Sequence, residues 1–321
     1  MSDQGTASIV AEGLRKQLGG KPVLRDLELE VAPGAIFGLF GPSGSGKSTC
    51  IHLCCGHLRP DGGSLRVLGE EPARFSRATR RRIGYAAQQF TLSPDLTAAA
   101  NVAFAAGLYG VPEWRSGPLV KTALELVDLW EARRVRARSL SGGMRRRLTL
   151  AAAIAHGPDL LFADEPTANL DPILRGRIWE HFRARAREGA TLLITTQYID
   201  EAEYCDRIGL MYDGALIAEG RPAELRRQAF GGDLVDVMVA GPSPSYLAGL
   251  AGVEGVRQTE SAPDRAMRLV ADDAQRAIPQ LLQALQGAGA EVQSVAPYQP
   301  SFDEVFVRLI ERHRAARAEG A

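Results

Sequence analysis

The sequence lacks any excess of charge and contains few lysines. Its 321 residues include 38 basic and 38 acidic side chains, so the formal net charge is zero. We therefore expect no nucleic-acid partner, because a protein that binds a phosphate backbone usually has a basic surplus. Lysine is so rare beside arginine that the single lysine of a glycine-rich segment, Lys47, stands out.

Long apolar runs are also missing. The two candidates, residues 95–111 and 148–162, are interrupted by polar residues and fall short of the roughly 18 continuous apolar residues of a membrane helix. The first residues have no signal-peptide core, so we expect the chain to stay in the cytoplasm. Four cysteines without the spacing of a disulfide framework fit a reducing compartment.

A glycine-rich loop follows a short apolar segment and precedes a helical one. Residues 41–49 read Gly-Pro-Ser-Gly-Ser-Gly-Lys-Ser-Thr, and in such a P-loop the backbone N–H groups and the helix start surround phosphates. A compact ammonium fits this loop where a guanidinium fork does not. We expect Lys47 to bridge the β- and γ-phosphates, Ser48 to bind Mg²⁺ and Thr49 to lie near the α-phosphate.

Two carboxylates end a second apolar segment, Leu160 to Ala163. A carboxylate has no packing reason to close a buried strand. We therefore expect Asp164 to hold Mg²⁺, partly through water, and Glu165 to orient or deprotonate the attacking water. The alternative is a carboxylate pair that only caps the strand end.

A serine and two glycines, Ser141, Gly142 and Gly143, precede a helical segment that begins at Met144. This arrangement is an anion site on physical grounds, and the serine is equally a good N-cap. Capping alone does not require two glycines, which favours a ligand.

The ordered set of these motifs resembles the ATP-binding-cassette (ABC) ATPases, over about residues 6–310. The resemblance implies that Ser141, Gly142 and Gly143 contact the γ-phosphate of the ATP held by a partner subunit. Because one chain carries one P-loop and one such segment, we expect two copies to form an ATP-sandwich dimer.

The same resemblance gives roles to four further residues. Gln88 matches the Q-loop glutamine that senses Mg²⁺ and the water, and Asp171 matches the D-loop aspartate that communicates across the dimer. Leu18 stands where the family usually stacks an aromatic ring on adenine, which leaves GTP open beside ATP. Gln197 stands where histidine is common, and glutamine can bond the γ-phosphate but cannot carry a positive charge.

The expected site is therefore large. The expected catalytic residues are Glu165 and Gln197, and the expected ligands of Mg²⁺ are Ser48, Gln88 and Asp164. The expected contacts with ATP are Leu18, Gly41, Pro42, Ser43, Gly44, Ser45, Gly46, Lys47, Ser48, Thr49, Gln88, Ser141, Gly142, Gly143 and Asp171.

The pattern of elements predicts an α/β fold with two domains. Alternating strands and helices, together with the resemblance, predict a P-loop ABC ATPase core over residues 1–232, with a mixed sheet and a helical subdomain over about 90–150. Composition changes near residues 230–232. Beyond this point the order βαββαβ, with its first helix at 243–250, predicts a small C-terminal α+β ferredoxin-like domain over 233–321.

Three features resemble the branch of daunorubicin-type drug-resistance exporters: Gln197, the Met-Arg-Arg-Arg run at 144–147, and the tail segment 300–306. The resemblance implies an ATP-hydrolysing subunit that powers a separate transmembrane permease and exports drug-like or lipidic compounds. It would then lie on the inner face of the cell membrane through that permease, with residues 92–102 as the docking segment.

Two other functions stay open. One is a nucleotide-gated binding protein with little turnover, suggested by Leu18 and Gln197. The other is a soluble ABC ATPase of translation or DNA repair, although such proteins usually carry tandem cassettes or a long coiled-coil insertion.

Two clusters receive a structural interpretation. The cysteines and histidines of residues 50–57 could suggest a metal site, but the helix after a P-loop packs against the sheet, where buried thiols are common. The arginines of residues 77–82 and 145–147 are expected on solvated faces and subunit contacts.

Overall fold

The computed structural model describes residues 7–240, 250, 253–261 and 266–319. Its contacts divide the chain into two compact units, residues 1–219 and 220–321. Among the described residues, no helix is long and apolar enough to span a membrane.

A six-stranded sheet forms the centre of the first unit, in the order β5-β6-β7-β3-β8-β9. The first five of these strands pair in parallel. Every residue of β3, β6 and β7 is buried, as expected for inner parallel strands covered on both faces. The strands are β3 Ile36–Phe40, β5 Ile83–Ala86, β6 Leu160–Asp164, β7 Thr191–Thr196, β8 Arg207–Tyr212 and β9 Ala215–Gly220.

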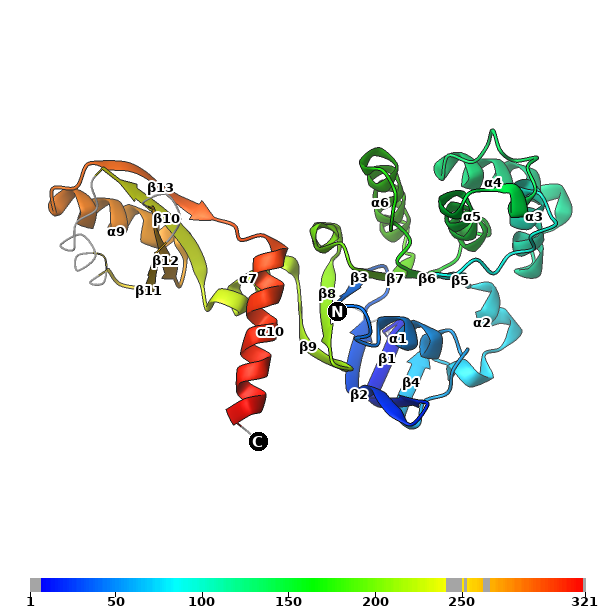
Figure 1. The fold of residues 1–321 in the computed structure, drawn as a ribbon, viewed down its shortest axis with the longest axis horizontal. Coiled ribbons are helices and arrows are strands. Elements are labelled where there is room, and N and C mark those ends of the chain that lie inside the picture. The colour runs from blue at the N-terminus through cyan, green and yellow to red at the C-terminus, as the bar shows by residue number, and fades with distance from the viewer. Residues whose placement is uncertain (1–6, 241–249, 251–252, 262–265, 320–321) are drawn as a thin grey trace, which may run out of the picture. The chain divides into compact units, whose positions relative to one another are not determined.

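A second, antiparallel sheet packs beside the first through one helix. Its order is β2-β1-β4, and its strands are β1 Ile9–Leu18, β2 Lys21–Val31 and β4 Gly62–Val67. Helix α1, Lys47–Cys54, contacts strands of both sheets and shares their apolar core. In Figure 1, α1 and the small sheet lie on one side of the large sheet.

The longer remaining helices of the first unit, α3 to α6, lie on the other side of the large sheet (Figure 1). Helix α5, Gly142–Ile154, packs on β5 and β6, and α6, Pro172–Arg187, packs on β7 and β3. Helices α3, Ala98–Leu108, and α4, Glu113–Leu126, pack on each other and on α5. A short helix, α2 Arg77–Arg81, packs on β5. The predicted α/β core with a mixed sheet and a helical subdomain is confirmed.

The second unit contains a four-stranded antiparallel sheet in the order β11-β12-β10-β13. This strand order agrees with the predicted ferredoxin-like module. Helix α9, Ala274–Gly287, covers the sheet, while the helix predicted at 243–250 falls almost entirely outside the described residues. The strands are β10 Asp233–Val239, β11 Val256–Ser261, β12 Ala266–Ala271 and β13 Val292–Tyr298.

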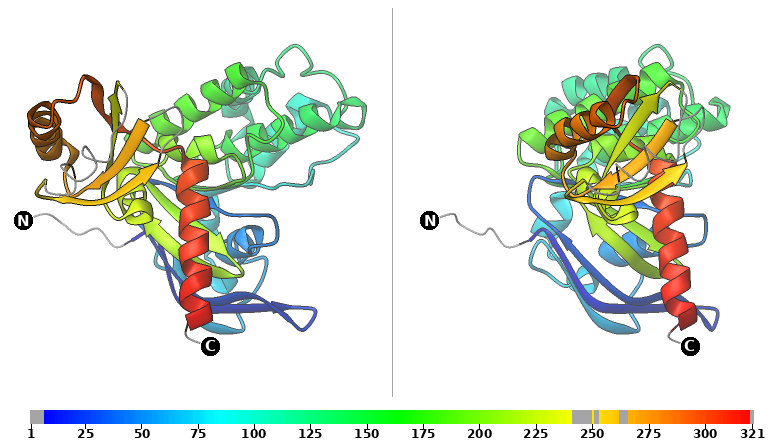
Figure 2. Two further views of the ribbon diagram at one scale, coloured as in Figure 1. Left: turned by 60° about the vertical axis from the view of Figure 1, so that its left-hand side comes forward. Right: turned by 90° about the vertical axis from the view of Figure 1, so that its left-hand side faces the viewer.

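Two more helices belong to this unit. Helix α7, Pro222–Phe230, packs against α10, Phe302–Glu319, which runs as one continuous helix (Figure 2). Ser301 and Glu304 form reciprocal bonds at the start of α10, at 3.3 and 3.4 Å, as their capping-box spacing predicts. Because α7 packs on α10, the units divide at 219/220, which is earlier than the division at 232/233 expected from composition.

A partly buried histidine generates a prediction about stability. His156 follows α5 and stacks on Tyr109, with ring centroids 4.0 Å apart, and burial lowers the pKa of His156 from 6.5 to about 4. Below pH 6.5 the unfolded chain binds a proton that the folded chain excludes, so stability falls as the pH drops toward 4. We expect His156 to contribute a loss on the order of 1–2 kcal/mol between pH 7 and pH 5.

Urea unfolding at both pH values checks this loss. His156→Phe keeps a ring against Tyr109 and should show a smaller loss on acidification than the unsubstituted protein. Equal losses in the two proteins would contradict the assignment.

Candidate nucleotide-binding site

The loop between β3 and α1 depends on glycine at two close approaches. Gly41 has φ 145° and Gly46 has φ 104°. A Cβ at Gly41 would collide with the carbonyl oxygen of Met211, and one at Gly46 would lie 2.7 Å from Leu24 and 2.9 Å from the carbonyl oxygen of Val23. Helix α1 begins without a capping side chain. Its first N–H groups are therefore suited to a phosphate.

Lys47 crosses this loop. Its Nζ donates to the carbonyl oxygens of Gly41 at 2.7 Å and Pro42 at 3.0 Å. Burial lowers the pKa of the Lys47 ammonium, while the carboxylates of Glu165 and Asp164 act in the opposite direction. The buried Oγ of Ser45 has no hydrogen-bond partner among the described residues. A buried cation, an unpaired hydroxyl and an uncapped helix start together fit a phosphate chain.

Asp164 ends β6 and is only 2% exposed. The parallel register places it opposite Thr195 of β7, and the Thr195 hydroxyl donates to Asp164 Oδ1 at 2.5 Å. Thr195 is itself fully buried. A buried carboxylate needs such a partner, because an unpaired charge in the interior is strongly unfavourable.

Glu165 leaves the strand in a left-handed conformation, with φ 50°. L-residues rarely adopt this conformation. Its N–H donates to the carbonyl oxygen and to the hydroxyl oxygen of Thr195, at 3.0 Å each. Its carbonyl oxygen accepts from Arg146 Nη2 at 2.6 Å. The backbone of Glu165 is thus held on both sides.

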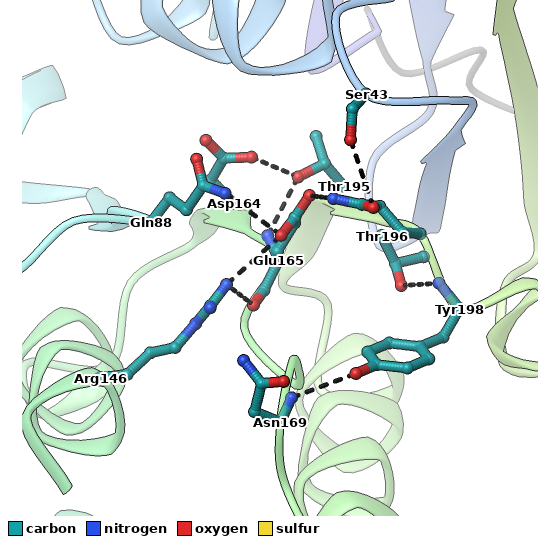
Figure 3. A network of polar contacts seen from close by, with 10 residues as sticks. Ser43, Gln88, Arg146, Asp164, Glu165, Asn169, Thr195, Thr196 and Tyr198 are labelled. Atoms are coloured by element: carbon teal, nitrogen blue, oxygen red, sulfur yellow. Dashed lines mark hydrogen bonds and ion pairs between the residues drawn. The ribbon is translucent and has the colours of Figure 1, made fainter. Parts of the chain in front are cut away.

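The carboxylate of Glu165 accepts hydrogen bonds from two glutamines, of which Gln88 is labelled in Figure 3. Gln88 Nε2 donates to Oε2 at 3.2 Å, and Gln197 Nε2 donates to Oε1. Ser43 Oγ in turn donates to Gln197 Oε1 at 3.4 Å. The structure therefore brings together residues that the sequence assigned to one site. They come from the P-loop, the Q-loop position, the end of β6 and the segment after β7, and they are Ser43, Gln88, Asp164, Glu165 and Gln197.

Other expected site residues lie elsewhere in this unit, and no hydrogen bond or ion pair described in the structure joins them to this network. Leu18 ends β1 and is 43% exposed. Ser141 caps α5 through a bond from Met144 N at 3.2 Å. Asp171 caps α6, and the N–H of Leu174 lowers the pKa of the Asp171 carboxyl. For Ser141, this cap is the structural role that the sequence left open beside the functional one.

Gly142 and Gly143 follow Ser141 in ordinary helical backbone. A Cβ at either position would meet no atom of the described residues within 4 Å. Neither backbone conformation nor packing within the chain therefore requires glycine here.

Three contacts at the site were not predicted from the sequence. Thr195 lies in an apolar run, which gives no indication that its hydroxyl bonds to Asp164. Tyr198, whose OH accepts from Asn169 N at 3.2 Å, is not among the residues expected at the site. Residues 145–147 are expected on solvated faces and subunit contacts, but the side chains of Arg146 and Arg147 are each only 19% exposed; the subunit contacts stay a prediction. Both arginines donate to backbone carbonyls of the first unit.

Thr195→Val tests the link between β6 and β7. The substitution keeps the shape of the side chain but removes a donor to Asp164 and an acceptor for the N–H of Glu165. We expect it to lower the free energy of unfolding by about 1–3 kcal/mol in urea titrations. Thr195→Ser keeps the hydroxyl and should lose less. A valine variant as stable as the original chain would show that this hydroxyl is dispensable.

Comparison with known proteins agrees with this geometry. The family model described as ABC transporter matches residues 24–168. A second model, the C-terminal domain of DrrA1-3-like ATP-binding proteins, matches residues 220–310.

Curated relatives match most of the chain. The daunorubicin resistance ATP-binding protein DrrA3 of Streptomyces coeruleorubidus is 38% identical over 305 residues, which are 94% of this chain and 95% of the relative. The daunorubicin/doxorubicin resistance ATP-binding protein DrrA of Streptomyces peucetius is 36% identical, over 96% of this chain and 94% of its own length. The Nod factor export ATP-binding protein I of Paraburkholderia xenovorans is 39% identical, over 75% of this chain and 79% of its own.

Solved structures match about two thirds of the chain. An ATP-binding subunit of an ABC transporter has a TM-score of 0.64 at 26% identity, over 68% of this chain and 92% of its own. A dimeric ATP-binding cassette in a post-hydrolysis state, bound to ADP and Pi, has a TM-score of 0.61 at 27% identity, over 66% and 98%. The chain belongs to the ATP-binding subunits of the ABC transporter family.

Proposed function

We propose that this chain binds Mg-ATP at its P-loop, hydrolyses it within a sandwich dimer of two copies, and thereby drives a separate transmembrane permease. The observation that carries the proposal is the Glu165 carboxylate, held by Gln88 and Gln197 beside the buried Asp164. This is an arrangement for chemistry on water next to a bound phosphate.

The P-loop would bind the triphosphate. Backbone N–H groups of residues 41–46 surround the phosphates, Lys47 exchanges its carbonyl partners for β- and γ-phosphate oxygens, and Thr49 lies near the α-phosphate. Leu18 packs against the base at the end of β1. Because a leucine offers no aromatic face for stacking, GTP is an alternative substrate to test beside ATP.

Three residues would hold Mg²⁺: Ser48, Asp164 and Gln88. A hydroxyl, a carboxylate and an amide oxygen are the hard ligands that this ion prefers. When bound, Mg²⁺ neutralises charge on the phosphate oxygens. Asp164 already has one oxygen fixed by Thr195, which sets the orientation of its carboxylate for such a role.

Glu165 is the proposed general base. Its carboxylate would accept the proton of the attacking water, while Gln88 and Gln197 direct that carboxylate. Gln197 also has an amide that can bond the γ-phosphate, and Ser43 donates to its oxygen. A neutral amide thus takes the place that histidine commonly has.

The dimer is supported by the two glycines that the chain's own fold does not require. Ser141, Gly142 and Gly143 would present the start of α5 to the γ-phosphate held by the partner, because the absence of side chains allows close approach. Asp171 would communicate across the same dimer interface. Dimeric cassettes among the similar structures are consistent with this assembly.

The proposed cargo of the permease is a drug-like or lipidic compound, moved outward. This follows the relatives, whose names are those of daunorubicin-resistance and Nod factor export proteins. Through the permease, the chain would lie on the cytoplasmic face of the cell membrane. The proposed domain limits are residues 1–232 for the nucleotide-binding domain and 233–321 for the accessory domain.

Residues 92–102 are the proposed docking segment. Asn101 is 2% exposed and folds the segment onto itself: its Oδ1 accepts from Ser93 N, and its Nδ2 donates to the carbonyl oxygens of Ser93, Leu96 and Thr97. Around this anchor the segment is exposed at residues 93–95. A loop with a fixed shape and an outward surface is suited to contact a partner.

Hydrolysis by the purified chain tests the proposed function. We expect Glu165→Gln to lower Mg-dependent ATP turnover by about 100-fold or more and to retain ATP binding, because the P-loop is unchanged. Glu188→Gln, at an exposed carboxylate after α6, serves as the control and should keep its turnover. If the unsubstituted chain has no turnover with or without its permease, a nucleotide-gated binding protein is favoured instead.

Transport by the complete complex tests the docking segment. Asp95 is 73% exposed and forms a surface ion pair with Arg138, which contributes little to stability, so Asp95→Arg should fold normally. We expect it to abolish transport while basal hydrolysis by the isolated chain stays within about twofold. Glu180→Arg, on the exposed side of α6, should leave both unchanged. Equal loss of transport and hydrolysis in Asp95→Arg would refute this docking site.

A further inference from the structure

One arginine of helix α5 reaches the proposed catalytic glutamate. Arg146 lies on α5, and its Nη2 donates to the backbone carbonyl of Glu165 at 2.6 Å. The same nitrogen lies 3.5 Å from Glu165 Oε2. The contact is visible in Figure 3, where the Arg146 side chain extends from its helix to Glu165.

Its two neighbours in the arginine run have other contacts. Arg145 lies over the ring of Phe90 at 5.9 Å, and Arg147 donates to the carbonyl oxygens of Val127 and Asp128. Arg146 is also largely buried, at 19% exposure, opposite a Glu165 side chain that is 13% exposed. A contact in such surroundings is screened less than a surface ion pair.

The bond to the carbonyl matters because of the conformation of Glu165. A non-glycine residue at φ 50° is strained and persists only where its surroundings fix it. Thr195 fixes the N–H side, and Arg146 fixes the C=O side. The direction of the carboxylate depends on this backbone conformation, so loss of either anchor changes it.

We propose that Arg146 is a positioning residue for Glu165: its guanidinium holds the left-handed backbone and directs the carboxylate toward the attacking water. This role rests on the proposed catalytic function of Glu165. Arg146 also lies within two helical turns of Ser141 on α5. The helix proposed to contact the partner's nucleotide therefore also anchors the general base of its own site.

Kinetics of full-length variants test the proposal. We expect Arg146→Gln to lower kcat about 10- to 100-fold, because a small misplacement of a catalytic group has effects of this size. The affinity for a fluorescent ATP analogue should stay within about twofold, since Arg146 does not belong to the P-loop. Arg146→Lys keeps the charge and one donor and should recover part of kcat. Arg145→Gln, the matched control on the same helix, should lose no more than about twofold.

The dimer gives a second readout. Glu165→Gln should accumulate an ATP-bound dimer in size-exclusion chromatography, and Arg146→Gln added to it should leave that dimer intact. Loss of the dimer, or of ATP binding, would place Arg146 at the nucleotide or the interface and overturn the positioning role. Equal kcat values for Arg146→Gln and Arg145→Gln would also overturn the positioning role. So would an Arg146→Lys variant that recovers no activity.

The two proposals fail in different ways. Turnover retained by Glu165→Gln contradicts the catalytic role of Glu165 and, with it, any positioning role for Arg146. Turnover lost by Glu165→Gln but kept by Arg146→Gln contradicts the role of Arg146 alone. Unfolding temperatures of all variants, measured in parallel, separate a kinetic defect from a loss of folded protein.

Discussion

A carboxylate pair at the end of a fully buried parallel strand is the constraint around which this site is built. Asp164 needs a donor inside the protein, and the register between β6 and β7 supplies the Thr195 hydroxyl. Strand β3, which leads into the P-loop, lies next to β7 in the sheet. Three adjacent parallel strands thus bring the carboxylates, Gln197 and the P-loop together at the carboxyl ends of the strands, where open α/β sheets commonly bind ligands.

Parts of this arrangement are local in sequence and could be predicted from it. The glycine-rich loop is recognised from its own residues, and the apolar run before Asp164 indicates a buried strand by itself, although the atoms that crowd Gly41 and Gly46 come from residues distant in sequence. The contacts of Thr195 and Arg146 span 31 and 19 residues along the chain. They depend on strand register and on the rotation of α5, which composition and spacing do not specify. The early start of the second unit has the same cause, because α7 is assigned by packing against α10.

Gln197 is suited to its position because an amide donates and accepts at once. Its nitrogen donates to Glu165, and its oxygen accepts from Ser43. A neutral imidazole could do the same in one tautomer, but a protonated imidazole could only donate. With glutamine, the hydrogen bonds of this position do not change with pH near neutrality.

Two cations act on the carboxylate pair from different elements. Lys47 belongs to the P-loop, and Arg146 belongs to α5. Each makes its shortest bonds to backbone carbonyl oxygens rather than to a carboxylate. The closest approach of Arg146 to the Glu165 carboxylate is 3.5 Å, longer than a direct charge-assisted bond of about 2.8 Å. The positive charges therefore lie near the carboxylates without occupying their oxygens in tight pairs. Such carboxylates keep the capacity to bind a metal ion or to accept a proton, which a close ion pair would remove.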